Sequence, residues 1–444
     1  MVLAPARKQE AASAALDAAI ERVVNSGNCS GCGACALLDP GLELRLDAEG
    51  FLRPVRRTSS GDPGPAPAPA SASVPASESA SALTSVKRFA AACPGVTVTA
   101  GNPAGAVRHP TMGPVVRAWN AWATDSEIRH RGSSGGALTA IAVWLLETGQ
   151  AARMVGARAD PAEPRRTVSV TIVSKEQAIG AAGSRYAPTA SASQAAALQN
   201  GSVFVGKPCE ASAIRSLMGS RAAEVATAPG ADPIILSFFC AGTPSQHATE
   251  NLVDSLGVAR GEALSDLWYR GRGWPGRFTA VRRDGSSVDA SYDDSWGSAL
   301  GPSVQWRCKV CADGVGESAD ITAADFWSAD EHGYPVFAEA AGQSALIART
   351  ERGYDIVLRA AEAGVISVTP MDIDDLAAVQ PLQTTRRGTL IGRLIGARLA
   401  GARVPRYRGF GLTVLGLTRI RETFRTAKGT FRRRRAAAKG SAPS

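Results

Sequence analysis

Eight cysteines, divided into two groups of four, constrain this chain more than any other feature of its sequence. The first group is a Cys-x2-Cys-x2-Cys triplet, followed much later by a Cys-Pro dipeptide. Three cysteines at positions i, i+3 and i+6 with a distant Cys-Pro form the ligand pattern of bacterial ferredoxin clusters. The pattern therefore predicts a [4Fe–4S] cluster, with Gly31 and Gly33 letting backbone amides approach its sulfides. The expected ligands are Cys29, Cys32, Cys35 and Cys93.

The second group is scattered, with one Cys-x2-Cys pair and two remote cysteines. Such a set can close another tetrathiolate site, around a cluster or around zinc. The pattern alone leaves three alternatives open: a second cluster, a zinc ion, or core cysteines without a ligand. Disulfides are not expected, because disulfide-rich scaffolds are short and secreted whereas this chain has 444 residues. The group consists of Cys209, Cys240, Cys308 and Cys311.

Length and hydropathy limit the class of protein. With 45% hydrophobic residues, the chain can bury one large core or two smaller ones. It contains no uncharged apolar stretch of about 18 residues, so a membrane-spanning helix is not expected. The first 24 residues predict a charged amphipathic helix without the apolar centre of a signal peptide, which favours a cytoplasmic protein.

The net charge of +9 is concentrated at one end. Residues 386–444 carry 16 Lys and Arg against one acidic residue, Glu422, so the remaining chain is mildly acidic. This tail predicts basic amphipathic helices that lie on an anionic membrane surface or dock an acidic partner. The alternative is a solvated helical extension with a disordered basic end. Nucleic acid is a less favoured partner, because no recognition fold accompanies the charge.

A Pro/Ala/Ser-rich stretch interrupts the first cysteine group and has almost no large apolar side chains. It cannot bury enough surface to offset its ordering entropy, so we expect a flexible insert. The cost of loop closure grows slowly with length, so Cys93 can still join the triplet. The expected segments are a helix (1–27), a ferredoxin-like cluster segment (28–100) with the insert (57–83), a core (110–385) and a basic tail (386–444).

The core alternates short β-type runs with helical stretches such as 194–199 and 210–218, which predicts an α/β domain. The clearest helix follows RGSSGG, and Ser133 or Ser134 is expected to cap it. The expected strands are 115–123, 154–159, 168–173, 202–206 and 233–239.

Several loops could hold an anionic cofactor. RGSSGG supplies free amides and hydroxyls at a helix N-terminus, where a flavin phosphate or a dinucleotide pyrophosphate would fit. In the turn that follows Ser184, Arg185 could pair with phosphate and Tyr186 could stack on a flavin ring. Lys207 stands beside Cys209 at a strand end, where it could balance the charge of a cluster or flavin. The alternatives are a plain helix cap, an exposed turn and an ordinary helix start.

Taken in order, the motifs resemble the beta-subunit family of coenzyme F420 hydrogenases and dehydrogenases, which also includes the plant 7-hydroxymethyl chlorophyll a reductase. The matching motifs lie within about residues 25–350 and are CSGCGAC with CPG, RGSSGGALTAIAVWLLETG, GSRYAP, VFVGKPCEASAIR, SFFCAGTPS, YRGRGWPG and CKVCADGVGESADITAADFW. The family usually has Gly-Asp where this chain has Ala324-Asp325, so contacts at that point are in doubt.

The resemblance implies an iron–sulfur flavoprotein oxidoreductase with FAD beside a cluster. It favours a second [4Fe–4S] cluster on the second cysteine group. It implies a redox partner such as ferredoxin, coenzyme F420 or another subunit, and F420 is a candidate substrate. The oligomeric state stays open. The candidate flavin contacts are Ser133, Ser134, Gly135, Gly136, Ser184, Arg185 and Tyr186.

We therefore expect an α/β (α+β) flavin-binding core, a small ferredoxin-like segment before it and a basic helical extension after it. The expected activity passes electrons between clusters and a hydride-exchanging FAD, in a cytoplasmic protein that is peripheral at the inner membrane face if the tail binds lipid. Two alternatives remain: a zinc-stabilised interaction protein without enzymatic activity, and an electron-transfer subunit without a substrate of its own.

Overall fold

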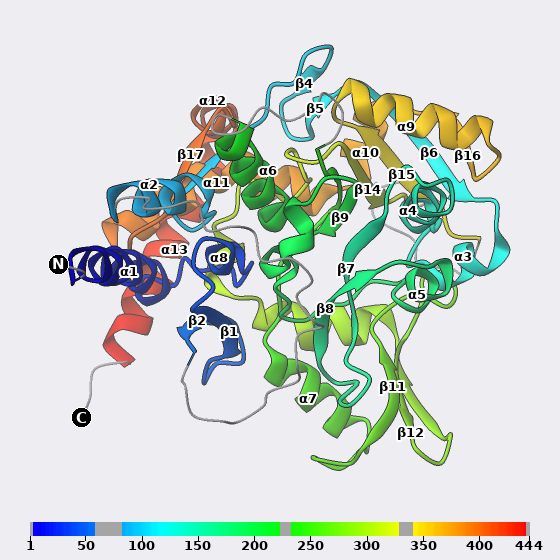
Figure 1. Cartoon of the computed structure of the whole chain (residues 1–444), viewed down its shortest axis with the longest axis horizontal. Coiled ribbons are helices and arrows are strands. Elements are labelled where there is room, and N and C mark those ends of the chain that lie inside the picture. The colour runs from blue at the N-terminus through cyan, green and yellow to red at the C-terminus, as the bar shows by residue number, and fades with distance from the viewer. Residues whose placement is uncertain (1–2, 58–81, 223–231, 328–340, 441–444) are drawn as a thin grey trace.

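An eight-stranded mixed sheet is the centre of the computed structural model, which describes residues 3–57, 82–222, 232–327 and 341–440 (Figure 1). Four neighbouring strands, β14, β10, β9 and β7, run parallel, and the other neighbours in the sheet pair antiparallel. In sheet order the strands are β16 (Ile366–Pro370), β6 (Arg117–Ala123), β15 (Ser344–Ala348), β14 (Ile321–Asp325), β10 (Ile234–Phe238), β9 (Ser202–Gly206), β7 (Arg153–Ala159) and β8 (Thr167–Ile172).

Both faces of the parallel strands are buried, as expected when helices cover a sheet on two sides. In β9, Val203 packs into the cluster on one face and Phe204 into the cluster on the other. The first face is covered by α4 (Ala137–Glu147) and α9 (Glu351–Glu362), and the second by α6 (Pro208–Ala222). Alternating apolar side chains therefore position α6 and its cysteine on a rigid support.

The predicted strands are confirmed. The run 202–206 is β9 with the same bounds, and β7, β8 and β10 differ from the expected ranges by no more than one residue at either end. The run 115–123 divides into β5 (Gly113–Val115) and β6. The helix expected at 194–199 is wrong, since only a 3-10 turn, Ala195–Leu198, forms there.

A second, smaller sheet lies against α7 (Gln246–Ser255) and is built from β11 (Leu264–Trp268), β12 (Phe278–Arg282) and β13 (Ser287–Ala290). Tyr269 and Phe278 fill its core, with their rings edge to face at 5.4 Å between centroids. The YRGRGWPGRF segment connects β11 to β12, so this sheet presents that segment to the rest of the core.

The N-terminal segment combines helices with a hairpin. It contains α1 (Leu3–Asn25), the 3-10 turn η1 (Ala34–Leu37), the antiparallel pair β1 (Leu42–Leu46) and β2 (Leu52–Arg56), and α2 (Ala82–Ala92). The predicted insert 57–83 lies almost wholly outside the described residues. A ferredoxin-like fold for the whole segment stays a prediction.

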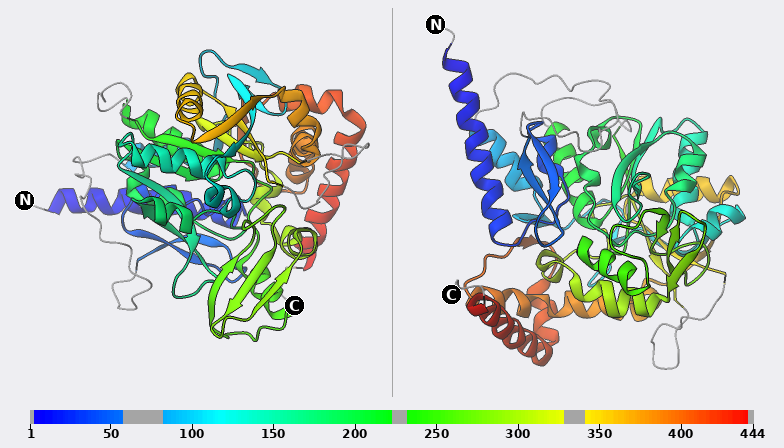
Figure 2. Two further views of the ribbon diagram at one scale, coloured as in Figure 1. Left: turned by 90° about the vertical axis from the view of Figure 1, so that its right-hand side faces the viewer. Right: turned by 90° about the horizontal axis from the view of Figure 1, so that it is seen from below.

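The basic tail packs against the chain. Its first helix, α11, is Pro381–Leu399, so it begins five residues before the expected boundary of 386. Then follow β17 (Arg406–Arg408), α12 (Leu412–Thr418) and α13 (Ile420–Gly440). Figure 2 shows these helices, in orange and red, against the body of the molecule. The solvated extension considered from sequence is wrong for α11, because Leu390, Leu394 and Ala397 are buried.

β17 pairs with β3 (Thr97–Thr99), which follows the first cysteine group. The two strands run parallel, although about 310 residues separate them in the chain. The side chain of Asn28 adds a hydrogen bond to the carbonyl of Arg403, at 3.0 Å. The N-terminal segment and the basic tail therefore meet beside the first cysteine group.

Candidate functional site

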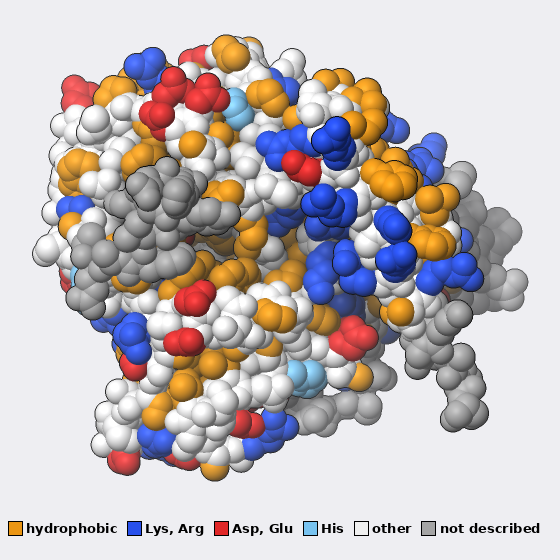
Figure 3. Space-filling view, turned by 180° about the vertical axis from the view of Figure 1, so that it is seen from behind, with side chains coloured by type: hydrophobic (Ala, Val, Ile, Leu, Met, Phe, Trp, Pro, Cys, Tyr) orange, Lys and Arg blue, Asp and Glu red, His pale blue; other side chains and the backbone are white. Residues whose placement is uncertain are grey.

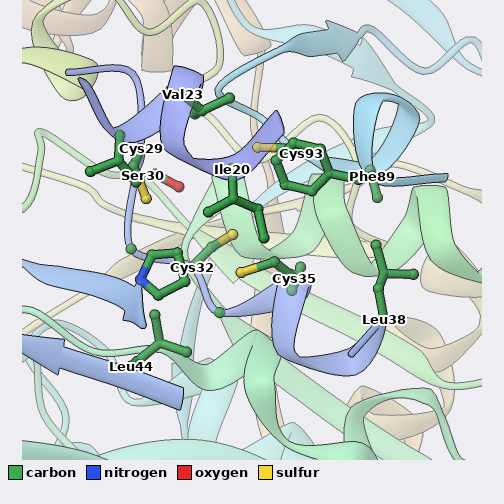
Figure 4. A pocket seen from close by; sticks show the side chains of 16 residues that line it. Ile20, Val23, Cys29, Ser30, Cys32, Cys35, Leu38, Leu44, Phe89 and Cys93 are labelled. Carbon is green, nitrogen blue, oxygen red and sulfur yellow. The ribbon is translucent and has the colours of Figure 1, made fainter. Parts of the chain in front are cut away.

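The four cysteines of the first group line one pocket. Cys29 and Cys32 lie on the loop between α1 and η1, Cys35 lies in η1, and Cys93 directly follows α2. Figure 4 shows the four sulfur atoms directed toward this pocket from three sides. The structure thus brings the four predicted ligands together, and their role as cluster ligands stays a prediction. The apolar walls come from Ile20, Val23, Leu38, Leu44 and Phe89.

Two glycines permit the tight course of the cysteine triplet. Gly31 and Gly33 have φ values of 70° and 88°, a left-handed region that favours glycine. A Cβ atom on Gly31 would lie 2.8 Å from the carbonyl oxygen of Leu52, and one on Gly33 would lie 2.8 Å from the Cβ of Ser193. The glycines of CSGCGAC are thus required by the backbone conformation and by close packing.

Burial raises the pKa of every thiol in this pocket. The pKa of Cys32 rises to about 11, chiefly through burial and further through the neighbouring charge of Cys29. Cys35 and Cys93 follow the same pattern, with burial first and neighbouring cysteines second. Four mutually repelling thiolates in an apolar pocket need a positive centre, which bound iron supplies as it displaces the protons. The donor set and its surroundings therefore fit a cluster.

Within the described part of the chain, no group of three or more His, Cys, Asp or Glu side chains converges closely enough to hold a single metal ion.

The second cysteine group gathers at the carboxyl edge of the parallel strands. Cys209 is the second residue of α6, directly after β9, and Cys240 lies two residues beyond the adjacent strand β10. Cys308 and Cys311 come from α8 (Trp306–Lys309) and the turn after it. The backbone amide of Thr243 donates to the sulfur of Cys308 at 3.4 Å, which brings the loop of Cys240 onto α8.

The cysteines of the second group affect one another's pKa values through their charges. Burial raises the pKa of Cys240 to about 12, and the neighbouring Cys308 and Cys311 add to this rise. Burial likewise raises the pKa of Cys209, with contributions from Glu210, Cys32 and Cys240 among others. Four thiols from three separate segments thus share one electrostatic environment, which fits a cluster ligand set.

The two cysteine groups abut through α6. Cys32 of the first group packs in the same apolar cluster as Ala211 and Ile214, which follow Cys209 on that helix. Cys32 also contributes to the raised pKa of Cys209. One helix therefore joins the two sites and keeps them side by side.

The RGSSGG segment, residues 131–136, is here called the Ser-Gly loop. It lies beside the end of β6, and its serines form hydrogen bonds with distant segments. The hydroxyl of Ser133 accepts a hydrogen bond from the amide of Ser184, and the hydroxyl of Ser134 is 2.7 Å from that of Ser344. The expected capping role is wrong, because α4 has Gly136 as its N-cap, with no side-chain hydrogen bond. The amide of Gly135 also donates to the Ser344 hydroxyl.

The predicted Arg185 is half-buried and supports the protein backbone. Its guanidinium donates to the hydroxyl of Thr167 at 2.8 Å and to the carbonyls of Leu267, Pro164 and Arg166. In this arrangement it braces the loop that carries Ser184. A phosphate contact from this side chain would require these bonds to rearrange.

Tyr186 is half-buried and packs against the core of the smaller sheet, whereas Lys207 is buried. Tyr186 packs against Trp296 at 4.8 Å and against Tyr269 at 6.0 Å between ring centroids. The ammonium of Lys207 donates to the carbonyl of Thr189 and pairs with Glu210 at 2.9 Å. Burial opposes the charge of Lys207, but Glu210, Cys209 and Cys240 outweigh it and raise its pKa. Lys207 therefore stands beside the second cysteine group.

Comparison with known proteins identifies the family of this chain. Residues 118–196 match the model described as coenzyme F420 hydrogenase/dehydrogenase, beta subunit N-term, and residues 200–374 match its C-terminal counterpart. The chain belongs to the coenzyme F420 hydrogenase/dehydrogenase beta-subunit family. The predicted resemblance is confirmed. As members of a family of hydrogenase and dehydrogenase subunits, such chains are oxidoreductase components.

Two relatives illustrate the similarity. The coenzyme F420 hydrogenase subunit beta of Methanococcus voltae is 26% identical over 304 residues, which are 64% of this chain and 96% of that protein. A chain from the F420-reducing [NiFe] hydrogenase complex of Methanosarcina barkeri has 21% identity and a TM-score of 0.48, covering 66% of this chain and 95% of that one.

The family match includes the Ser-Gly loop and the second cysteine group but excludes both ends of the chain. The first cysteine group precedes residue 118, and α11, α12 and α13 follow residue 374. This member of the F420 hydrogenase/dehydrogenase beta-subunit family thus combines a family core with two further segments, which meet at the β3–β17 pair.

A buried arginine near the Ser-Gly loop was not singled out from the sequence. Arg270 is 2% exposed and pairs with Asp325, the last residue of β14. Its guanidinium lies 4.9–5.0 Å from the ring centroids of Trp274, Tyr292 and Trp327, close enough for cation–π attraction. The segment YRGRGWPGRF has three arginines among aromatic residues, and only the structure shows which of them is enclosed.

Proposed function

We propose that this chain is an iron–sulfur flavoprotein that passes electrons between two [4Fe–4S] clusters and an FAD. The observation that carries the proposal is the contact of the two cysteine groups through α6. When bound, the flavin exchanges a hydride as two electrons, and the clusters carry electrons one at a time. A flavin that faces the substrate and clusters that face the redox partner would therefore connect the two-electron chemistry of the substrate with the one-electron chemistry of the partner.

Ser133–Gly136, with Ser184, would hold the flavin. The antiparallel pairings of β15 make β6 parallel to β14, so the end of β6 lies at the same sheet edge as Cys209 and Cys240. Ligands of open α/β sheets bind at such an edge. Arg185 and Tyr186 would shape the pocket from behind, and Lys207 would offset negative charge between flavin and cluster.

The proposed substrate is inferred from the names of the relatives. We propose coenzyme F420 as the hydride-exchanging substrate, and ferredoxin or a second subunit as the one-electron partner. Of the two alternatives, the electron-transfer subunit would have the same cysteine sites without turnover of F420. The zinc-stabilised interaction protein would have zinc in place of iron.

Cofactor content tests the proposal. Protein purified without oxygen should contain close to eight iron atoms, eight sulfides and one FAD per chain, as two clusters require. Cys93→Ser should lose about half of the iron and keep the flavin, and Cys308→Ser should lose the other half. Ser26→Ala, near the first group but outside the pocket lining, is the control and should keep both clusters.

A different outcome would distinguish the alternatives. Colourless protein with stoichiometric zinc would overturn the iron–sulfur assignment. Full iron and flavin without reduction of F420 would favour the electron-transfer subunit instead.

We propose further that the tail binds an anionic membrane surface on the cytoplasmic side. Among the described residues, 12 large hydrophobic side chains are exposed, and seven of these lie in the helices α11, α12 and α13. They accompany the run of 16 basic residues, which has one acidic residue. The seven are Leu382, Ile395, Leu399, Val414, Leu417, Ile420 and Phe424.

Helix geometry places several of these side chains on one flank. The positions of Gly392 and Gly396 contact the carbonyls of Thr423 and Ala427, so α11 and α13 run in the same direction. With 3.6 residues per turn, Ile395 and Leu399 of α11 then lie on the same side of the pair as Ile420 and Phe424 of α13. Figure 3 shows Lys and Arg side chains beside hydrophobic ones on the side of the molecule where the tail packs. Apolar side chains within a basic surface suit an anionic bilayer.

Vesicle sedimentation tests this surface. At moderate salt the protein should bind vesicles that contain phosphatidylglycerol and should not bind vesicles of pure phosphatidylcholine. The double substitution Leu417→Ser and Phe424→Ser should weaken binding at least tenfold, because it removes apolar contact from the flank. Val107→Ser, at a 77% exposed position outside the tail, should have no effect. Equal binding of the parent to both vesicle types, or no binding to either, would contradict the proposal and would favour an acidic protein partner.

The described helices include none that is both long and apolar enough to cross a membrane.

A further inference from the structure

One buried arginine lies between the two cysteine groups. Arg307 is 1% exposed and directly precedes Cys308 in α8. Its Nη2 donates to the carbonyl of Pro94 at 2.7 Å, and Pro94 directly follows Cys93. A single guanidinium therefore connects a residue beside one cysteine group to a residue beside the other.

Within the part of the chain that the structure describes, no carboxylate neutralises this arginine. Of the Asp and Glu residues that the structure describes, none forms an ion pair with Arg307, and its Nε has no hydrogen-bond partner. The comparably buried Arg270 and Arg387 do have carboxylate partners, Asp325 and Glu317. A buried charge without a counterion is strongly unfavourable, because the interior does not replace the water that would solvate it. Arg307 therefore needs negative charge from another source.

Bound clusters would supply that charge, because Arg307 lies between the two ligand groups. Cys308 directly follows Arg307, and Pro94, whose carbonyl accepts from Arg307, directly follows Cys93 of the other group. The guanidinium thus acts electrostatically on both groups at once, from a position where water does not screen it.

We propose that Arg307 is a positioning residue that balances the charge of both clusters and raises both reduction potentials. This inference rests on the proposed function. Each cluster gains one electron and one unit of negative charge on reduction, with no bond formed or broken. A fixed positive charge stabilises the reduced form more than the oxidised form. Because one guanidinium serves both clusters, each potential depends on the same side chain.

Two other basic residues provide matched controls. Arg53 donates to the carbonyl of Cys29 and acts on the first group, whereas Lys207 lies beside Cys209 and Cys240. Arg53→Gln should therefore lower the potential of the first cluster alone, and Lys207→Gln that of the second alone. Arg307→Gln should lower both.

Redox titration followed by electron paramagnetic resonance measures these shifts. The Cys93→Ser and Cys308→Ser proteins, each with one cluster, assign each potential. Iron content of the parent is measured first, and a parent without iron would reject the proposed function before Arg307 is tested. With full iron, a shift at one cluster only, or at neither, would overturn the shared role.

Arg307→Lys covers the case in which the Gln variant loses iron. Lysine keeps the charge but not the planar fork that reaches Pro94. The charge-balancing role predicts that the Lys variant retains both clusters, with potentials closer to the parent than to any neutral variant. Loss of iron in the Lys variant as complete as in the Gln variant would overturn the proposal, since it would assign Arg307 a purely structural role.

Discussion

At the scale of single residues, buried arginines bring charge into a mostly apolar core. Arg270 is enclosed by three aromatic rings and holds Asp325 at the end of β14, while its Nε donates to the carbonyl of Pro275. The negative charge of Asp325, with Tyr186 and Tyr292, raises the pKa of Arg270 against the opposing effect of burial. This pair fixes the loop between β11 and β12 to the carboxyl edge of the main sheet.

Removing one partner of this pair should be costly. We expect Arg270→Leu to lower the free energy of unfolding by about 3 kcal/mol, because it leaves Asp325 without its counterion. The double variant Arg270→Leu and Asp325→Leu should recover much of that loss. The exposed pair Arg277–Asp289 is the control, and Arg277→Leu should cost less than about 1 kcal/mol. Urea titration measures all three changes, and equal losses in the single and double variants would contradict the role of the pair.

Sequence alone indicated cysteines better than any other site residue. Cys29, Cys32 and Cys35 follow one another at a fixed spacing, so their common pocket is a local property of the chain. The hydroxyls of Ser133 and Ser134 bond instead to Ser184 and Ser344, about 50 and 210 residues away. No local pattern indicates such partners, and for this reason the capping prediction was wrong. Arg307 was missed similarly, since its significance lies in the carboxylate it lacks.

At the scale of helices and strands, a stripe of glycines allows two helices of the tail to pack closely. Gly388, Gly392 and Gly396 recur every four residues along α11. A Cβ atom at Gly392 would lie 2.2 Å from the carbonyl oxygen of Thr423, and one at Gly396 would lie 2.2 Å from that of Ala427. The backbones of α11 and α13 therefore approach so closely that only glycine fits between them.

Replacing one of these glycines tests the packing. Gly392→Ala should lower the free energy of unfolding by about 1–3 kcal/mol, because the two helices must separate. Gly219→Ala makes the same change in helix α6, where no atom lies within 4 Å of the added methyl group. This control should be neutral or should stabilise the protein by up to about 1 kcal/mol, through helix propensity. Thermal unfolding compares the two, and equal midpoints would reject the close contact.

Three of the four parallel strands, β7, β9 and β10, could be predicted within about one residue because their signal is local, whereas β14 was not predicted. The run SVFVG of β9 is apolar and β-branched between turn residues, so its limits are visible in the sequence. The packing of α11 was not predicted, since a glycine-rich basic helix gives little indication of which surface will cover it. The glycine spacing becomes informative only once Thr423 and Ala427 are known to lie opposite.

At the scale of the whole molecule, the tail stabilises both cysteine groups. One apolar cluster contains Val98 beside the first group, Val310 and Ala312 within the second, and Leu390 and Leu394 of α11. Arg386 of α11 also donates to the carbonyl of Cys240 at 2.9 Å. The two segments outside the family match are thus joined to the family core around the cysteines.

The pairing of β3 with β17 also has a consequence for biosynthesis. During translation, Thr97–Thr99 leave the ribosome long before their partner strand, Arg406–Arg408, exists. At about 5–20 residues per second, the interval is of the order of 15–60 seconds. Throughout that time β3, just after the first four cysteines, is without its partner strand. A cluster inserted before translation ends would therefore enter a segment whose β3 is still unpaired, and a cluster inserted afterwards would enter a segment already joined to the tail.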